Sequence, residues 1–362
     1  MSANLQAVSD AGVSIWLDDL SRDRLQSGSL AKLIADSNVV GVTTNPSIFS
    51  AAIKGSALYK EDVLALKAQG ADTASIVNAL TTSDVTSACD LFTDIYKNTN
   101  GVDGRVSIEV DPFFAHETEK TLEQGKSLWN QIARPNVLIK VPATLEGLPA
   151  IRELTAAGIS VNVTLIFSVA RYEMVMEAYL TGLEDRIAAG LPLAGIHSVA
   201  SFFVSRIDTE IDKRLDAISP DSPLRGKSAI ANAVLAYEAY LKVVESERWK
   251  SLASQGAAEQ RPLWASTGVK DKKYDSTRYV IELIAPHCVN TMPEGTLNEV
   301  REHGVVRGDT ITSNFEASHA HFAALNSAGI DFEDVVSFLE RDGVKKFADA
   351  WQELLDNVSA VS

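Results

Sequence analysis

The sequence has little cysteine and no long apolar run. Cys89 and Cys288 are the only cysteines among 362 residues, which does not indicate a disulfide scaffold. Cys89 shares an apolar stripe at helical spacing with Val85 and Phe92, so we expect it to fill a core. No run approaches the ~20 apolar residues that a membrane span needs, and the first residues lack the basic and apolar segments of a signal peptide. These absences predict a soluble, cytoplasmic protein without a membrane partner.

Positive charge is also scarce. Lysine and arginine number 33 against 48 aspartates and glutamates, and the formal net charge is −15. Such an acidic chain is not expected to bind nucleic acid or an anionic membrane surface as its main partner. An anionic small substrate would need a local basic pocket. The sequence gives no signal for a protein partner.

Several familiar motifs are missing as well. Neither the phosphate-binding pattern G-x-x-x-x-G-K-[ST] nor the nucleophile pattern G-x-S-x-G occurs. Metal-ligand spacings are absent, so no metal site is expected. His319 and His321 are two apart in a helical stretch and do not share a face, which predicts surface positions.

Short β-rich runs alternate with helical patterns along the whole chain. Alternation of this kind predicts a parallel sheet covered by helices. Eight units without an evident linker favour a single closed (β/α)8 barrel domain over residues 1–362. An open doubly wound sheet is the alternative, but no Gly-rich fingerprint follows the first run. The runs are residues 13–18, 39–45, 105–111, 136–143, 159–167, 196–204, 262–267 and 289–292.

The chain after the eighth run is longer than one closing helix needs. Residues 294–362 are predicted to form a helical extension, part of which folds over the barrel mouth. Helical patterns within it are clearest at residues 332–339 and 344–355. A further helix is predicted at residues 274–284, between the seventh and eighth runs.

One lysine stands in the middle of the fourth run. Side chains of a strand alternate between its two faces, so Val137 and Ile139 share one face and Lys140 lies on the other. If the apolar face packs on the helices, Lys140 points into the barrel. The alternative is a strand-end lysine whose amine extends to water.

The same alternation sends other polar side chains inward. Buried polar groups are costly unless they bond to one another or perform chemistry, and these lie toward the strand ends where barrel active sites sit. A purely structural polar cluster remains the alternative. The group comprises Asp18, Glu109, Lys140, Asn162, Thr164 and Ser201, with Asn45 at the end of the second run, whereas Asp19 falls on the opposite face.

A buried lysine among acids suits carbonyl chemistry. Burial favours the neutral amine, which attacks a ketone and forms a Schiff base. The cationic Schiff base withdraws electrons, so the adjacent C–C bond can break once a base, here Asp18, removes a hydroxyl proton. Glu109 and Thr164 are expected to hold the water that imine formation releases, unless they simply bond to each other.

Four stretches resemble, in order, the strand motifs of transaldolases, class I aldolase barrels of the pentose phosphate pathway. They are Gly41–Ser47, Val137–Ala143, Asn162–Ser168 and Ser201–Arg206. The chain length and the C-terminal region resemble the actinobacterial-type branch. This resemblance implies transfer of a dihydroxyacetone unit from sedoheptulose 7-phosphate to glyceraldehyde 3-phosphate, giving erythrose 4-phosphate and fructose 6-phosphate. It implies sugar-phosphate substrates and no metal or organic cofactor.

The resemblance also implies residue roles by position. Lys140 matches the Schiff-base lysine, Asp18 the acid/base aspartate, and Glu109 and Thr164 the residues that hold the catalytic water. The substrate-binding positions are Asn45, Asn162, Ser201, Phe203 and Arg206. The better-known branch has a second phosphate-binding arginine after the seventh strand, whereas Ala265–Lys270 has none, so Ser266 or Lys270 is expected to replace it.

Two other functions compete with transaldolase. A fructose 6-phosphate aldolase is shorter, and it carries glutamine at the position of Glu109 and tyrosine at that of Phe203. A catalytically silent sugar-phosphate-binding barrel would not need Asp18, Glu109 and Lys140 together. Both residue comparisons favour a transaldolase.

Overall fold

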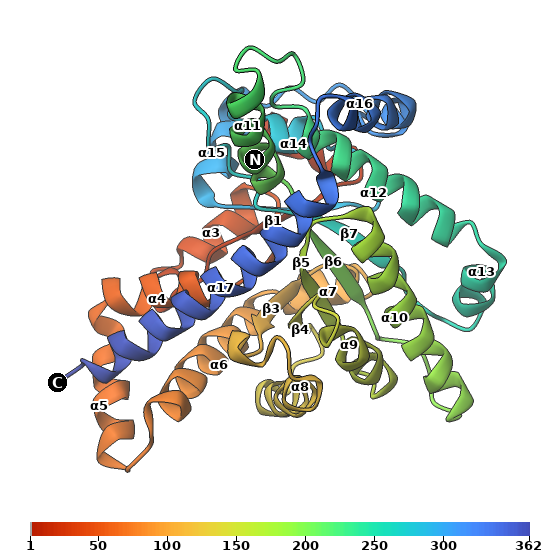
Figure 1. Cartoon of the computed structure of the whole chain (residues 1–362). Coiled ribbons are helices and arrows are strands. Elements are labelled where there is room, and N and C mark those ends of the chain that lie inside the picture. Colours follow the sequence, from red (N-terminus) through yellow and green to blue (C-terminus); the bar gives the residue numbers. More distant parts are fainter. Residues whose placement is uncertain (1) are drawn as a thin grey trace.

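The computed structural model describes residues 2–362 and contains a closed barrel of parallel strands (Figure 1). The barrel closes because β1 pairs with both β2 and β8. Each predicted β-rich run overlaps one strand, which confirms the (β/α)8 barrel, although β7 begins two residues before its predicted run. The strands are β1 (Ser14–Leu17), β2 (Val39–Val42), β3 (Arg105–Glu109), β4 (Val137–Pro142), β5 (Val161–Ile166), β6 (Ser198–Phe203), β7 (Gln260–Ala265) and β8 (Val289–Met292).

Helices surround this barrel. Within the described part of the chain none is both long and apolar enough to cross a membrane. The α-helices are α1 (Ala3–Asp10), α2 (Arg22–Gln26), α3 (Ser29–Asp36), α4 (Pro46–Gly55), α5 (Lys60–Ala68), α6 (Thr73–Leu91), α7 (Thr93–Asn98), α8 (Thr118–Ile132), α9 (Gly147–Ala156), α10 (Val169–Ala188), α11 (Ser205–Ile218), α12 (Ser228–Val244), α13 (Glu247–Ser254), α14 (Arg278–Ile281), α15 (Glu294–His303), α16 (Phe315–Ser327) and α17 (Phe332–Ser359). Short 3-10 helices are η1 (Ala57–Tyr59), η2 (Pro112–Phe114) and η3 (Thr312–Asn314).

The helix predicted at residues 274–284 is wrong in its length, because α14 covers only Arg278–Ile281. In the segment before α14, aspartate side chains accept hydrogen bonds from backbone N–H groups. Asp271 accepts from the Lys273 N–H at 2.9 Å, and Asp275 accepts from the Thr277 N–H at 2.8 Å. Such local bonds favour turns over helix.

The inward and outward faces of the strands follow the predicted alternation. Asn162 of β5 donates to Ser107 of β3 at 2.9 Å. Because β4 lies between these strands, that bond crosses the barrel interior. Ile139, on the opposite face of β4, lies against Gly125 of α8, where an added Cβ would meet its Cγ2 at 3.5 Å. Polar side chains therefore share the inside and apolar ones pack on the helices.

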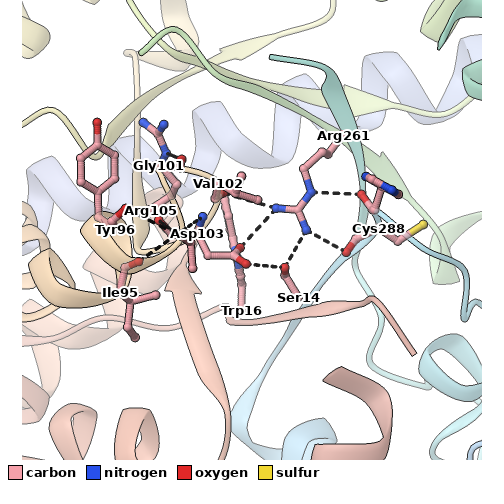
Figure 2. Close-up of polar contacts among 12 residues, drawn as sticks. Ser14, Trp16, Ile95, Tyr96, Gly101, Val102, Asp103, Arg105, Arg261 and Cys288 are labelled. Atoms are coloured by element: carbon pink, nitrogen blue, oxygen red, sulfur yellow. Dashed lines mark hydrogen bonds and ion pairs between the residues drawn. The ribbon is translucent and has the colours of Figure 1, made fainter. Parts of the chain in front are cut away.

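An ion pair between a buried arginine and a largely buried aspartate lies at the N-terminal end of the barrel (Figure 2). Arg261 of β7 pairs with Asp103 at 3.2 Å and donates to the Ser14 hydroxyl at 2.6 Å. Its remaining donors reach the carbonyls of residues 102, 287 and 288. Asp103 also accepts from the Trp16 indole at 3.1 Å. This network connects β1, β7 and the loops before β3 and β8, at the end remote from the strand C-termini.

A close contact with Trp16 explains the glycine that begins the stretch Gly41–Ser47. Gly41 of β2 faces the Trp16 ring, and an added Cβ would lie 2.5 Å from that ring. Only glycine fits at such an approach. Further along the motif, Asn45 accepts from the Ile48 N–H at 3.0 Å and Pro46 follows at the first helical position, so α4 begins there.

The C-terminal extension ends in one long helix that crosses the barrel mouth. Helix α17 joins the two predicted helical patterns, and Figure 1 shows it running alongside α4. Gly343 lets the helix approach β5 closely, since an added Cβ would meet Leu165 at 3.1 Å. Four residues later Phe347 lines the cavity at the strand ends. The prediction that part of residues 294–362 covers the mouth is confirmed.

Candidate active site

A cavity of about 190 Å³ lies at the C-terminal ends of the strands. The structure brings most of the predicted site residues to its wall, from six of the eight strands or the segments that follow them. These residues are Asp18, Asn45, Lys140, Thr164, Ser201, Phe203, Arg206, Ser266 and Lys270. Glu109 and Asn162 lie just outside this lining.

Lys140 is buried at the base of the cavity, with 4 % of its surface exposed. Its Nζ donates to the Thr44 carbonyl at 3.0 Å and to Glu109 Oε2 at 3.1 Å. A third neighbour is the ring of Phe347, whose centroid lies 5.4 Å from Nζ. Two oxygens and one aromatic ring therefore surround the amine, and Lys140 lines the cavity.

Glu109 and Thr164 each have an oxygen without a partner. Among residues 2–362, neither Glu109 Oε1 nor Thr164 Oγ1 has a hydrogen-bond partner, although both atoms are buried. They lie on β3 and β5, the two neighbours of the lysine strand. Buried polar atoms of this kind are usually satisfied by ordered water. The predicted pair thus does not bond internally, and it can hold a water beside Lys140.

The environment of Glu109 also adjusts its acidity. Burial raises the pKa of Glu109 to about 7, against the opposing effect of the Lys140 cation. A carboxyl group with such a pKa can both give and take a proton near neutral pH. Glu109 also lines a smaller adjacent cavity of about 20 Å³ together with Gln124 and Trp351.

Asp18 follows β1 and lines the main cavity with Lys140. The Thr43 hydroxyl donates to Asp18 Oδ1 at 2.6 Å and contacts the Thr291 hydroxyl at the same distance. Burial raises the pKa of Asp18, while the positive charge of Lys140 opposes that rise. The neighbouring Asp19 pairs instead with Arg24 at 2.5 Å, as its opposite direction on the strand predicts.

Asn162 lies beneath the cavity and is bonded on both sides. Its Nδ2 donates to Ser107, and its Oδ1 accepts from the Ser201 hydroxyl at 2.7 Å. Its side chain is fully buried, whereas Ser201 reaches the cavity wall. Asn162 thus orients the Ser201 hydroxyl, and its predicted contact with the substrate stays a prediction.

Arg206 supplies the positive charge that the acidic sequence requires. Within the described residues its Nη1 is buried without a partner, and its guanidinium carbon lies 5.1 Å from the ring centroid of Phe203. Burial lowers the pKa of Arg206. An arginine with an unused buried donor is well suited to bind phosphate. It also borders a second chamber of about 530 Å³, shared with Asn45 and Phe347.

Ser266 and Lys270 follow β7, the strand next to β6, and line the same cavity. Ser266 has a φ of +56°, and its hydroxyl contacts that of Ser205 at 3.0 Å. Lys270 is exposed and lines the same cavity as Arg206. The loop therefore places a second cation, Lys270, on the cavity wall.

Sequence reasoning missed six residues of the cavity wall, among them Thr43, Thr291 and Phe347. Thr43 has the same direction as Gly41 on the second strand, so alternation alone could have found it. Phe347 belongs to a stripe with Gly343 and Trp351 at intervals of four in α17. That spacing shows a common helix face, but not which part of the barrel the face meets.

The similarity to known proteins covers almost the whole chain and not only the four stretches named above. The family model described as Transaldolase/Fructose-6-phosphate aldolase matches residues 15–358. The chain belongs to this family. It is 57% identical to a transaldolase of Saccharopolyspora erythraea over 99% of this chain and 97% of that relative.

Two further relatives are similarly close. A transaldolase of Mycobacterium tuberculosis strain H37Rv is 56% identical over 99% of this chain and 96% of the relative. A protein named transaldolase 1 of Streptomyces avermitilis is 57% identical over 98% of this chain and 95% of the relative. The predicted resemblance to actinobacterial transaldolases is confirmed, and the chain is an enzyme of the transaldolase type.

Proposed function

We propose that this enzyme transfers a dihydroxyacetone unit from sedoheptulose 7-phosphate to glyceraldehyde 3-phosphate through a Schiff base on Lys140. The products are erythrose 4-phosphate and fructose 6-phosphate. The observation that carries the proposal is the buried Lys140 amine, 3.1 Å from Glu109 and in one cavity with Asp18. A reactive amine needs this combination of burial and nearby proton carriers.

The reaction begins at the ketose carbonyl. Lys140 Nζ bonds to the carbonyl carbon, and the oxygen leaves as water after two proton transfers. Glu109 supplies one of these protons and, with Thr164, holds the released water for the later hydrolysis. The raised pKa of Glu109, about 7, suits both directions of this exchange.

Cleavage and transfer then depend on Asp18. It removes the proton from the hydroxyl next to the bond that breaks, and the electrons of that C–C bond move toward the cationic nitrogen. The aldose leaves, while the three-carbon unit stays on Lys140 as an enamine. The enamine attacks the acceptor aldehyde, and Asp18 returns the proton to the new hydroxyl. Hydrolysis of the imine completes the cycle.

The rest of the cavity binds the sugar. Asn45 has its Oδ1 occupied by the start of α4, so its amide N–H groups remain for a substrate hydroxyl. Ser201, oriented by Asn162, and the ring of Phe203 contribute to the wall. Arg206 with Lys270 and Ser266 is proposed to bind the phosphate.

Omitting the acceptor tests the proposed transfer. With fructose 6-phosphate and erythrose 4-phosphate, we expect sedoheptulose 7-phosphate and glyceraldehyde 3-phosphate to form. With fructose 6-phosphate alone, the three-carbon unit should stay on Lys140, and free dihydroxyacetone should appear only slowly. Rapid dihydroxyacetone release without acceptor would indicate an aldolase. Binding without any turnover would indicate a silent barrel.

Replacing Lys270 tests the phosphate site. Lys270→Ala is expected to raise KM for fructose 6-phosphate about five-fold, the effect of ~1 kcal/mol from a solvent-screened ion pair. Turnover at saturation and the reaction of unphosphorylated fructose should change little. Lys272→Ala is the matched control, because Lys272 is exposed in the same loop and does not line the cavity. Equal KM values in both variants would remove Lys270 from the phosphate site.

A further inference from the structure

Helix α17 presents one face to the active site. Gly343, Phe347 and Trp351 recur at intervals of four residues, which places them on one side of the helix. Gly343 packs against β5 through Leu165, and Trp351 lines the small cavity beside Glu109. Phe347 lies between them and borders both the main cavity and the second chamber. This face is thus a wall of the reaction chamber.

The Phe347 ring is the apolar neighbour of the Lys140 nitrogen. Its centroid is 5.4 Å from Nζ, within the range of a cation–π contact, and only 5 % of the residue is exposed. The other close neighbours of Nζ are oxygens, the Thr44 carbonyl and Glu109. The ring also packs edge-on against Phe203 with centroids 6.5 Å apart, which fixes its orientation.

A second cation lies over Phe203, the other ring of this aromatic pair. The Arg206 guanidinium lies 5.1 Å from the Phe203 ring centroid. The two packed rings therefore each have one cation over them, at the lysine end and at the arginine end of the same cavity. Such pairing uses the negative face of each ring rather than its bulk alone.

The chemistry at Lys140 creates a lasting positive charge. As the N–C bond forms, the carbonyl oxygen receives one proton from the amine and one from a carboxylic acid, and it departs as water with the C–O electron pair. The nitrogen keeps one hydrogen and becomes an iminium cation. In a buried site that cation has little water to solvate it, so an adjacent π face has its largest effect.

We propose that Phe347 is a catalytic residue whose ring face stabilises the cationic Schiff base on Lys140. This role rests on the proposed function, and it adds a residue from the C-terminal helix to the strand residues of the site. Phe347 transfers no proton. It lowers the energy of the iminium relative to the neutral carbinolamine that precedes it.

Graded fluorination of Phe347 tests this role without changing the shape of the wall. Replacement by mono-, di- and trifluorophenylalanine weakens the ring quadrupole stepwise while nearly preserving volume. The measured quantity is the single-turnover rate of borohydride-trapped adduct on Lys140 with fructose 6-phosphate. We expect this rate to fall at each step, to about ten-fold below the parent for the trifluoro ring. Phe347→Leu, which keeps an apolar side chain without a π face, should fall similarly.

Phe338 provides the matched control. It lies in α17, packs on the same core, and lines neither the main cavity nor the second chamber. The same fluorinated series at Phe338 should leave the trapping rate unchanged, and thermal unfolding should confirm that every variant is folded.

The outcomes separate the two proposals. A flat rate across the Phe347 series in an enzyme that traps normally would overturn the role of Phe347 alone. Slow trapping by Phe347→Leu with a flat fluorinated series would reduce Phe347 to a packing residue and also overturn the role. If the parent enzyme forms no adduct at Lys140, the Schiff-base function fails and the cation–π role fails with it.

Discussion

Replacement of Lys140 by methionine is expected to lower kcat by at least about 10⁴-fold, because the covalent intermediate can no longer form. Methionine resembles the lysine stem in volume but has no nucleophilic nitrogen. Every later step, from C–C cleavage to transfer, depends on the iminium. Borohydride reduction with fructose 6-phosphate, followed by mass spectrometry, should give an adduct at residue 140 of the parent and none in the variant.

The fold of this variant should survive. Loss of the amine leaves Glu109 buried without its cation, but burial already raises the pKa of Glu109 to about 7, so the carboxyl can take up a proton. Ketose binding through Arg206 should also persist. Lys120→Met is the control, since Lys120 pairs with Glu117 on the surface at 2.6 Å. Retained turnover in Lys140→Met, or an adduct on another lysine, would contradict the mechanism.

Replacement of Arg261 by methionine is expected to lower the free energy of unfolding by about 3–5 kcal/mol, the usual effect of breaking a buried ion pair. Asp103 would keep a buried charge without its cation, and the backbone carbonyls that Arg261 contacts would lose their donor (Figure 2). Urea denaturation measures the loss. Activity of the folded fraction should remain, since Arg261 lies at the opposite end of the barrel from Lys140.

Two further variants separate the causes. Adding Asp103→Asn to Arg261→Met should restore part of the stability, because the uncompensated charge is removed. Arg248→Met breaks half-exposed ion pairs to Glu177 and Glu184 and should change stability by less than about 1 kcal/mol. Similar losses of unfolding free energy from Arg248→Met and Arg261→Met would mean that the Arg261–Asp103 network stabilises the fold no more than a half-exposed ion pair does.

Strand geometry made much of the site predictable from the sequence. Successive strand side chains alternate in direction, and a barrel has a single interior. Once the apolar face of the fourth run was assigned to the helices, the inward direction of Lys140 followed. The choice of Asp18 over Asp19 followed from the same rule, and the Asp19–Arg24 pair agrees with it.

Contacts between distant segments were not predictable in this way. Asn162 points inward as expected, but its bonds to Ser107 and Ser201 depend on the stagger of three strands. Phe347 reaches Lys140 only because α17 folds back across the mouth. The division of the chain into one domain with residues 294–362 as an extension stays a prediction, as do the roles of the site residues.

The position of α17 after all eight strands has a consequence for biosynthesis. Because synthesis runs from the N-terminus, a nascent chain contains every strand of its sheet before Phe347 and Trp351 are added. The wall that α17 provides is therefore the last part of the cavity to be made, and it packs onto a barrel whose strands already exist.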